Sequence, residues 1–370
     1  MEQHVLIAGA SGVIGAGAVE HFAALPGWLV TGLSRRAPVL REGTAFQHAA
    51  VDLDDAAACA AAVETLPPVT HLVYAAVAEA PGLVGGWYDA ALIARNGKMF
   101  ANLLDPLAAA GGLRHVSLLQ GTKAYGGHHH AVPLPCREDS VRDEHANFYW
   151  LHEDHARRRA EEAGFEFTIF RPQVLLGGAS GVAMNPVAAL GAYMALTAEL
   201  GLPLALPGKG EAMWEMVDTS LLAEALAWAA VSPAAAGQAF NITNGDVLVL
   251  AHDWPRLAAT LGRETGGESP LGLAGFFAEA SVQQAWGRLA ARHGLREASL
   301  GALLGESHHY MDLLLGPRQA TRPLPMLLST IKLRQAGFGA CRDSLQSLLH
   351  WLDRMVALKL LPPLRREEHE

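Results

Sequence analysis

The chain has 370 residues, of which 51% are hydrophobic and 18% charged, and its formal net charge is −9. This composition is typical of a globular protein with a large core, and the length suggests roughly two domains, or one domain with an added lobe. The acidic balance argues against a nucleic-acid partner. The 3 cysteines are too few and too widely spaced for a disulfide framework or a zinc site, which indicates a reduced, cytoplasmic compartment.

The N-terminal residues form a short apolar run broken by glycine, which is typical of a strand and not of a signal peptide. No stretch of about twenty apolar residues is free of charged, glycine or proline interruptions, so we expect no membrane-spanning segment. Helix faces that would form a homodimer resemble those that pack internally. The sequence is therefore compatible with a homodimer but does not predict one.

Strand and helix signals alternate over the first part of the chain. Apolar runs of strand length occur at Val5–Ala8, Trp28–Leu33, Phe46–Asp52, His71–Ala76, His115–Leu119 and Phe165–Phe170. Helical patterns occur at Val13–Ala24, Ala56–Leu66, Ala91–Ala110 and Tyr149–Ala163. Strands that are apolar on both faces and separated by helices predict a Rossmann-type, doubly wound α/β fold with a parallel sheet. The carboxyl ends of such strands share one edge of the sheet, where ligands bind.

The pattern becomes mostly helical after Arg171-Pro172. Met184–Leu200 and Ser220–Ala230 predict helices, Ala239–Ile242 predicts a short strand, and the chain from Trp254 onward is almost wholly helical. We expect a dinucleotide-binding domain over residues 1–178 and a smaller, mostly helical substrate-binding lobe over residues 179–370. Some strands of this lobe can return to the sheet of the first domain.

A glycine-rich turn joins the first predicted strand to the first predicted helix. Gly9 permits a tight turn, Gly12 lets the backbone approach a pyrophosphate, and Gly15 allows close packing of helix and strand. The N–H groups at the start of the helix favour phosphate. The dinucleotide contacts predicted here are Gly9, Ser11, Gly12, Val13, Ile14 and Gly15. The spacing G-x-x-G-x-x-G differs from the simplest NAD-binding pattern, and the alternative is an ordinary glycine-rich turn.

Ser34, Arg35 and Arg36 end the second predicted strand, where an enzyme that prefers NAD usually has an acidic residue. Because guanidinium groups suit a 2′-phosphate, this segment predicts NADPH or NADP+ as the cofactor. The alternative is a pair of surface arginines. Asp52 and Leu53, at the end of the third strand, are placed to meet the adenine. The remaining predicted cofactor contacts are Ala75, Gln120, Lys123, Pro172 and Val174.

Short-chain dehydrogenases normally place a tyrosine and a lysine four residues apart on one helix. The tyrosine donates or accepts the proton, and the charge of the lysine lowers the tyrosine pKa. No such pair occurs here, because Tyr125 is followed four residues later by His129 and Tyr149 by Glu153. The site is therefore expected to depart from the common arrangement.

Two other segments stand in its place: Gln120–Gly126, at the end of the fifth strand, and Asn147–Asp154, at the start of the next helix. They resemble the progesterone 5β-reductase and iridoid synthase-like family, a divergent branch of the extended short-chain dehydrogenases/reductases within the NAD-dependent epimerase/dehydratase superfamily. The similarity continues through Arg171-Pro172, Met184-Asn185, Ala239–Asp246 and Gly337-Phe338, so it covers nearly the whole chain.

The resemblance implies a reaction. Members of that family reduce the C=C bond of enones with NADPH, and a tyrosine and a lysine stabilise the developing enolate oxygen. Lys123 matches the lysine, Trp150 occupies the aligned position of the catalytic tyrosine, and Tyr149 matches the tyrosine before it. Adjacent helix residues point about 100° apart, so Tyr149 does not simply replace its neighbour. An indole N–H donates a hydrogen bond but does not relay a proton.

We therefore expect an NADPH-dependent reductase of an activated C=C bond, or of a carbonyl, in a small apolar molecule. Lys123 would stabilise the enolate oxygen, with Tyr149 and Trp150 as further candidate catalytic residues. The structural alternatives are pairing of Lys123 with the ribose or a carboxylate, and simple packing of Tyr149. The alternative function, which Trp150 favours, is a non-redox isomerase or cyclase, or an NADP(H)-binding sensor. Carbonyl reduction or epimerisation of nucleotide sugars is a weaker third interpretation.

Three consecutive histidines, His128 to His130, raise the question of a metal ion. Consecutive side chains are expected to diverge, and no acidic or thiol cluster with ligand spacing accompanies them. We therefore predict no metal site. We expect instead a loop over the cleft, in which one of the three histidines touches the substrate.

Overall fold

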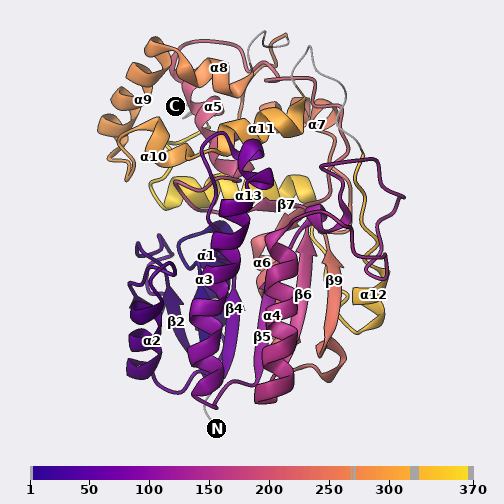
Figure 1. The fold of residues 1–370 in the computed structure, drawn as a ribbon. Coiled ribbons are helices and arrows are strands. Elements are labelled where there is room, and N and C mark those ends of the chain that lie inside the picture. The colour runs from indigo at the N-terminus through magenta and orange to yellow at the C-terminus, as the bar shows by residue number, and fades with distance from the viewer. Residues whose placement is uncertain (1–2, 268, 270–271, 317–324, 366–370) are drawn as a thin grey trace. The chain divides into compact units, whose positions relative to one another are not determined.

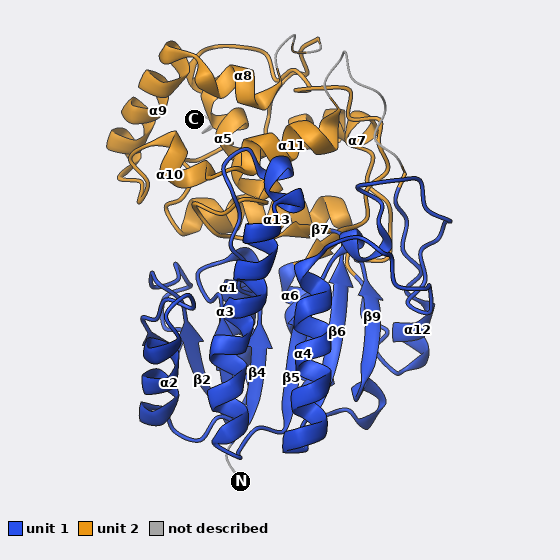
Figure 2. Ribbon diagram, viewed as in Figure 1, with its two compact units in different colours: residues 1–173, 219–243, 326–341 blue, residues 174–218, 244–325, 342–370 orange. Residues whose placement is uncertain are grey.

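The computed structural model describes residues 3–267, 269, 272–316 and 325–365 (Figure 1). The chain divides into two compact units, each made of three segments (Figure 2). Unit 1 consists of residues 1–173, 219–243 and 326–341, and unit 2 consists of residues 174–218, 244–325 and 342–370. The chain therefore returns to unit 1 twice, at residues 219 and 326, before it ends in unit 2.

Unit 1 is built on a seven-stranded parallel sheet with the order β3-β2-β1-β4-β5-β6-β9. Its strands are β1 (Gln3–Ala8), β2 (Trp28–Leu33), β3 (Gln47–Ala49), β4 (His71–Tyr74), β5 (His115–Leu119), β6 (Glu166–Pro172) and β9 (Gln238–Ile242). The order reverses between β1 and β4, which is the topological switch point where doubly wound sheets bind ligands. The predicted Rossmann-type fold is confirmed.

Helices cover both faces of this sheet (Figure 1). They are α1 (Val13–Ala23), α2 (Ala56–Thr65), α3 (Ala90–Ala109), α4 (Phe148–Ala163), α6 (Thr219–Val231) and α12 (Ile331–Gln335), with the short 3-10 helices η1 (Leu83–Tyr88), η2 (Thr122–Tyr125) and η3 (Pro233–Ala235). α1 packs beside α6 on one face, and α3 packs between α2 and α4 on the other. Side chains of Asp55, Asp89 and Asn147 cap α2, α3 and α4 by accepting backbone N–H bonds.

Unit 2 is mostly helical, as predicted for the later part of the chain. It contains α5 (Pro186–Glu199), α7 (Leu250–Thr260), α8 (Leu273–Ala278), α9 (Ala280–His293), α10 (Leu300–Leu304), α11 (Ser307–Leu315) and α13 (Ser344–Ala357), and the parallel strand pair β7 (Val174–Leu176) and β8 (Met216–Asp218). α5 is apolar around almost its whole circumference, because it contacts α9, α10, α11 and α13. Within the described residues, no helix has both the length and the apolarity needed to cross a membrane.

Candidate functional site

The glycine-rich turn follows β1 at the switch point of the sheet. Gly9 has a φ of +84°, and a Cβ at this position would lie 2.7 Å from the backbone nitrogen of Ala76. A Cβ on Gly15 would overlap the carbonyl oxygen of Gly9. Ser11, Val13 and Ile14 share the turn, and Gly12 precedes α1 without a capping side chain. The result is a tight backbone cradle with helical N–H groups at its edge, which fits the pyrophosphate of a dinucleotide.

Two arginines follow β2, close to this cradle. The backbone nitrogen of Gly9 donates to the carbonyl oxygen of Leu33 at 2.9 Å, which ties the glycine turn to the end of β2. The buried Ser34 donates from its Oγ to the carbonyl oxygen of Arg36 at 2.7 Å and folds the segment back. Arg35 and Arg36 are exposed. This arrangement leaves both guanidinium groups accessible at the carboxyl end of the strand.

The other predicted cofactor contacts lie at or just beyond strand ends. Ala75 follows β4 and packs against the glycine turn. Beyond β3, Asp52 is exposed and Leu53 is buried. Pro172 is the last residue of β6 in unit 1, whereas Val174 begins β7 in unit 2. The residues of unit 1 therefore gather on the carboxyl edge of its sheet, as the fold requires.

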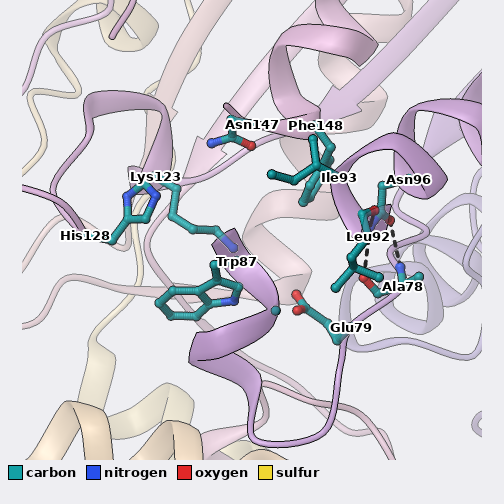
Figure 3. Close-up of a pocket in the computed structure, with 11 residues that line it drawn as sticks. Ala78, Glu79, Trp87, Leu92, Ile93, Asn96, Lys123, His128, Asn147 and Phe148 are labelled. Carbon is teal, nitrogen blue, oxygen red and sulfur yellow. Dashed lines mark hydrogen bonds between the residues drawn. The ribbon is translucent and has the colours of Figure 1, made fainter. Parts of the chain in front are cut away.

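Lys123 reaches into a small pocket of unit 1 (Figure 3). Its Nζ lies 4.3 Å from the ring centre of Trp87 and 5.9 Å from those of Phe148 and Tyr149. The carboxylate of Glu79 enters the same pocket beside Trp87. Aromatic faces stabilise a cation that has lost its water, and the carboxylate supplies the opposite charge. The structure thus places a buried ammonium group at the end of β5, among aromatic rings.

The pocket changes the proton affinity of both charged groups. Burial lowers the pKa of Lys123, against the opposing effect of the Glu79 charge. Burial raises the pKa of Glu79, against the opposing effect of Lys123. The two pKa values therefore move toward each other, which favours transfer of a proton between neighbouring groups.

Asn96 of α3 fixes the segment that carries Glu79. Its Oδ1 accepts the backbone N–H of Ala78 at 2.8 Å, and its Nδ2 donates to the Ala78 carbonyl oxygen at 3.0 Å (Figure 3). Sequence reasoning missed Glu79, Trp87 and Asn96. The signal for Glu79 was its place just beyond the fourth strand, at the edge where ligand-binding groups collect.

Tyr149 and Trp150 point to different surroundings. The Tyr149 hydroxyl packs against Gly121, where a Cβ would lie only 3.1 Å from it. The indole N–H of Trp150 donates to the carbonyl oxygen of His145 at 3.1 Å, and the Arg142 guanidinium stacks 4.3 Å from its ring centre. Of the two predicted candidates, Tyr149 shares the surroundings of Lys123. Trp150 packs against the loop that precedes α4.

The side chain of Gln120 is engaged within the protein. Its Oε1 accepts from Nε of Arg171 at 2.9 Å, and its Nε2 donates to Glu153 at 3.1 Å. Arg171 also donates to the Tyr125 hydroxyl at 3.3 Å, and Tyr125 donates to Oδ1 of Asn241 at 2.6 Å. This network joins the ends of β5, β6 and β9. The side chain of Gln120 therefore helps to hold these strand ends together, and its predicted contact with the cofactor stays a prediction.

The expected divergence of the consecutive histidines is wrong for His128 and His129, whose ring centres are 4.1 Å apart. The turn that carries them closes on Gly126, whose carbonyl oxygen accepts the backbone N–H of His129 at 2.8 Å. This turn directs both rings to one side. His145, which no motif singled out, lies 4.8 Å from each of them, measured between ring centres.

Comparisons with known proteins agree with this geometry. The sequence pattern of the NAD dependent epimerase/dehydratase family matches residues 5–243. An (S)-8-oxocitronellyl enol synthase of Antirrhinum majus is 29% identical over 96% of this chain and 92% of that protein. A 3-oxo-Delta(4,5)-steroid 5-beta-reductase of Arabidopsis thaliana is 29% identical over 98% of this chain and 94% of that protein.

Among solved structures, the UDP-glucose 4-epimerase of Thermotoga maritima with UDP-glucose matches with a TM-score of 0.68 at 14% identity, over 96% of this chain and 99% of that one. The UDP-glucose 4-epimerase of Thermus thermophilus with NAD matches with a TM-score of 0.65 at 18% identity, over 95% and 98% of the two chains. At these identities the likeness is one of fold.

Proposed function

Because the chain belongs to the NAD dependent epimerase/dehydratase family, we propose that it uses NADPH to reduce an activated C=C bond, or a carbonyl, of a small apolar molecule. Membership makes it an enzyme of the short-chain dehydrogenase/reductase type. The curated relatives confirm the resemblance drawn from its sequence. The substrate in one of their names, a 3-oxo-Delta(4,5)-steroid, is a conjugated enone, and the product in the other is an enol.

The observation that carries this proposal is the buried ammonium group of Lys123. When bound, NADPH supplies a hydride for the β-carbon of an enone, while negative charge develops on the carbonyl oxygen. A fixed cation in a water-poor pocket stabilises that oxygen far more than one in bulk water does. Lys123 is the hydrogen-bond donor that we assign to this oxygen, and the negative charge of the Glu79 carboxylate helps to keep Lys123 protonated.

Tyr149 is the second donor that we assign to the oxygen. Its ring lies beside Lys123, and its hydroxyl lies at Gly121, on the same end of β5. Trp150 is assigned a packing role, because its N–H is bonded to the backbone of His145. Trp150, which aligns with the catalytic tyrosine of the family pattern, thus packs against a loop, whereas the residue before it, Tyr149, lies beside Lys123.

Arg35 and Arg36 support NADPH over NADH. A dianionic 2′-phosphate gains charge-assisted hydrogen bonds from two accessible guanidinium groups, whereas a 2′-hydroxyl does not. No carboxylate occupies residues 34–36, where NAD-preferring enzymes usually bind the ribose.

The proposal is tested by following NADPH consumption with a panel of small enones and ketones, with NADH in parallel. We expect NADPH to be used in preference, and Lys123→Ala to lower kcat by about 10²–10³-fold, the usual effect of removing one oxyanion donor. Tyr149→Phe should lower kcat by about 10–10²-fold, because one hydrogen bond to a charged oxygen is lost. Lys98→Ala, on an exposed lysine of α3, is the matched control.

Trp150→Phe tests the two neighbouring aromatic residues separately. It removes the hydrogen bond to His145 and weakens the packing of the ring under Arg142, so kcat should stay unchanged while the free energy of unfolding falls by about 1 kcal/mol or more. If NADPH binds but no enone or ketone is reduced, the reductase assignment is wrong. The non-redox isomerase or cyclase, or the NADP(H)-binding sensor, then becomes the better assignment.

A further inference from the structure

A cluster of three imidazoles lies beside the Lys123 pocket without being part of the proposed reaction. His128 and His129 come from the turn after η2, and His145 comes from the segment before α4. Each of the three offers one nitrogen that could bind a metal ion, and these nitrogens lie within 4.8 Å of one another. Among the residues that the structure describes, this is the group of three or more potential metal ligands that lie so close together. Segments that are separated in sequence have thus been brought together at one point.

The carboxylate of Asp143 orients one of the three rings. Its Oδ1 accepts from Nδ1 of His145 at 2.6 Å, so Nδ1 carries the proton and Nε2 keeps its lone pair. Nε2 now accepts one N–H of Asn147 at 3.0 Å. A ligating histidine normally has this arrangement, with one ring nitrogen bonded to a carboxylate and the other directed at the metal.

His128 supplies an independent observation. Its Nδ1 is buried and has no hydrogen-bond partner, although a polar atom removed from water normally has one. Its backbone is held, because its carbonyl oxygen accepts from the Tyr88 hydroxyl at 2.9 Å. An imidazole nitrogen buried without a partner, next to two further imidazoles, is explained if a cation takes its lone pair.

Gly126 leaves room for the pair formed by His130 and Asp143 next to the cluster. Gly126 has a φ of +75°, and a Cβ there would lie 2.7 Å from Nε2 of His130 and would overlap the carboxylate of Asp143. His130 contacts Asp143, with Nε2 and Oδ2 2.7 Å apart, and is not among the three residues whose ligand atoms group together. It is therefore a natural control, since it shares the turn and the carboxylate but lies outside the cluster.

We propose that His128, His129 and His145 bind one divalent transition-metal ion of the zinc class, with Asp143 as the carboxylate that orients His145. Neutral imidazoles suit Zn²⁺, Co²⁺, Ni²⁺ and Cu²⁺, and three histidines leave a fourth position open. Tetrahedral Zn–N bonds of about 2.0–2.1 Å need nitrogens about 3.4 Å apart, so the turn has only a short distance to close. The ion would link the turn that carries His128 and His129 to the segment before α4, which carries His145.

The test uses the full chain without a histidine tag, freed of metal by a chelator. Zn²⁺ is titrated in competition with a chromophoric chelator, and Co²⁺ is titrated while its visible absorption is followed. We expect one equivalent of either metal to bind per chain, with the intense visible bands of tetrahedral Co²⁺. His128→Gln and His145→Gln should each weaken Zn²⁺ binding by more than about 100-fold, and Asp143→Asn by about 10–100-fold.

His130→Gln should bind Zn²⁺ as the wild type does. Thermal unfolding guards against misfolded variants: Zn²⁺ should raise the Tm of the wild type and of His130→Gln, but not that of His128→Gln. Binding of several weak equivalents, loss of affinity in His130→Gln equal to that in His128→Gln, or no binding to the wild type would each overturn the proposal.

Discussion

Lys123 and Glu79 show how strongly one buried residue depends on another. In the proposed reaction Lys123 has to be protonated to stabilise the oxyanion, and burial acts against that state by lowering the pKa of Lys123. Glu79 is the charge that restores part of the proton affinity. The two residues therefore form one functional group, although they are far apart in sequence. Asn96 helps to hold Glu79 in place, because its side chain bonds both the N–H and the carbonyl oxygen of the preceding residue, Ala78.

The pH profile of kcat reports this coupling. Activity should fall as the pH rises through the pKa of Lys123, and that fall should begin below the ordinary lysine value of 10.5. Glu79→Gln keeps the shape of the side chain but removes the charge that raises the pKa of Lys123, so the alkaline limb should move to still lower pH. Glu64→Gln, on an exposed residue of α2, should leave the profile unchanged. An alkaline limb that stays in place in Glu79→Gln would show that the two groups are not coupled.

The candidate residues that the sequence suggested belong to local patterns, whereas the candidates that only the structure revealed do not. Gly9, Arg36 and Lys123 lie in short motifs at strand ends, where spacing alone is informative. Glu79 and His145 belong to no motif. They lie near Lys123 only because the segments around β4, η2 and α4 come together at one edge of the sheet. That contact between distant segments leaves no local pattern in a single sequence.

At the level of elements, strand prediction succeeded where the strands are buried on both faces. The expected bounds Trp28–Leu33 and His115–Leu119 are those of β2 and β5, because both segments are mainly apolar and end where Ser34 and Gln120 follow. β7 and β8 were not predicted. Each has only three residues, and their pairing joins Val174 to Met216 across an intervening helix. Such short strands have no periodicity of their own.

The amino ends of β4 and β5 carry a second element-scale feature, a pair of buried histidines. His71 pairs with His115 in the sheet register, and their ring centres are 6.4 Å apart. Burial lowers the pKa of His71 to about 4 and that of His115 to about 3. In the unfolded chain both should titrate near the ordinary value of 6.5. Between these pKa values the two histidines are protonated in the unfolded chain but not in the folded protein.

The sign of the pH dependence follows from these pKa values. Both histidines are neutral in either state above pH 6.5, so their full contribution to stability is present there. It is lost as the pH falls from about 6.5 to about 4 for His71, by about 3 kcal/mol, and to about 3 for His115. Urea unfolding between pH 7 and pH 4 should show this fall, and His71→Gln combined with His115→Gln should flatten it. His350→Gln, on an exposed residue, should not, and an equal slope in the double variant would contradict the assignment.

At the level of the whole molecule, the family match and the folded unit end at different places. The match stops at residue 243, yet unit 1 also includes residues 326–341. Met326 and Leu328 are buried there with Tyr125 and Cys136, and α12 packs on β9. Asn241 of β9 donates from Nδ2 to the carbonyl oxygens of Cys136 and Ser329, both at 3.1 Å. These contacts cross about a hundred residues of chain or more, so local patterns could not predict them.

This arrangement predicts that residues 326–341 are needed to fold unit 1. Two shortened chains test it, each with residues 174–218 replaced by a Gly/Ser linker. One ends at residue 243, and the other continues through a second linker into residues 326–341. Loss of Met326 and Leu328 alone removes about 3–6 kcal/mol of apolar burial, a large part of the stability of a domain. Urea unfolding followed by circular dichroism should show a cooperative transition only for the longer chain. Equal transitions in both chains would mean that unit 1 folds without residues 326–341, which would contradict the prediction.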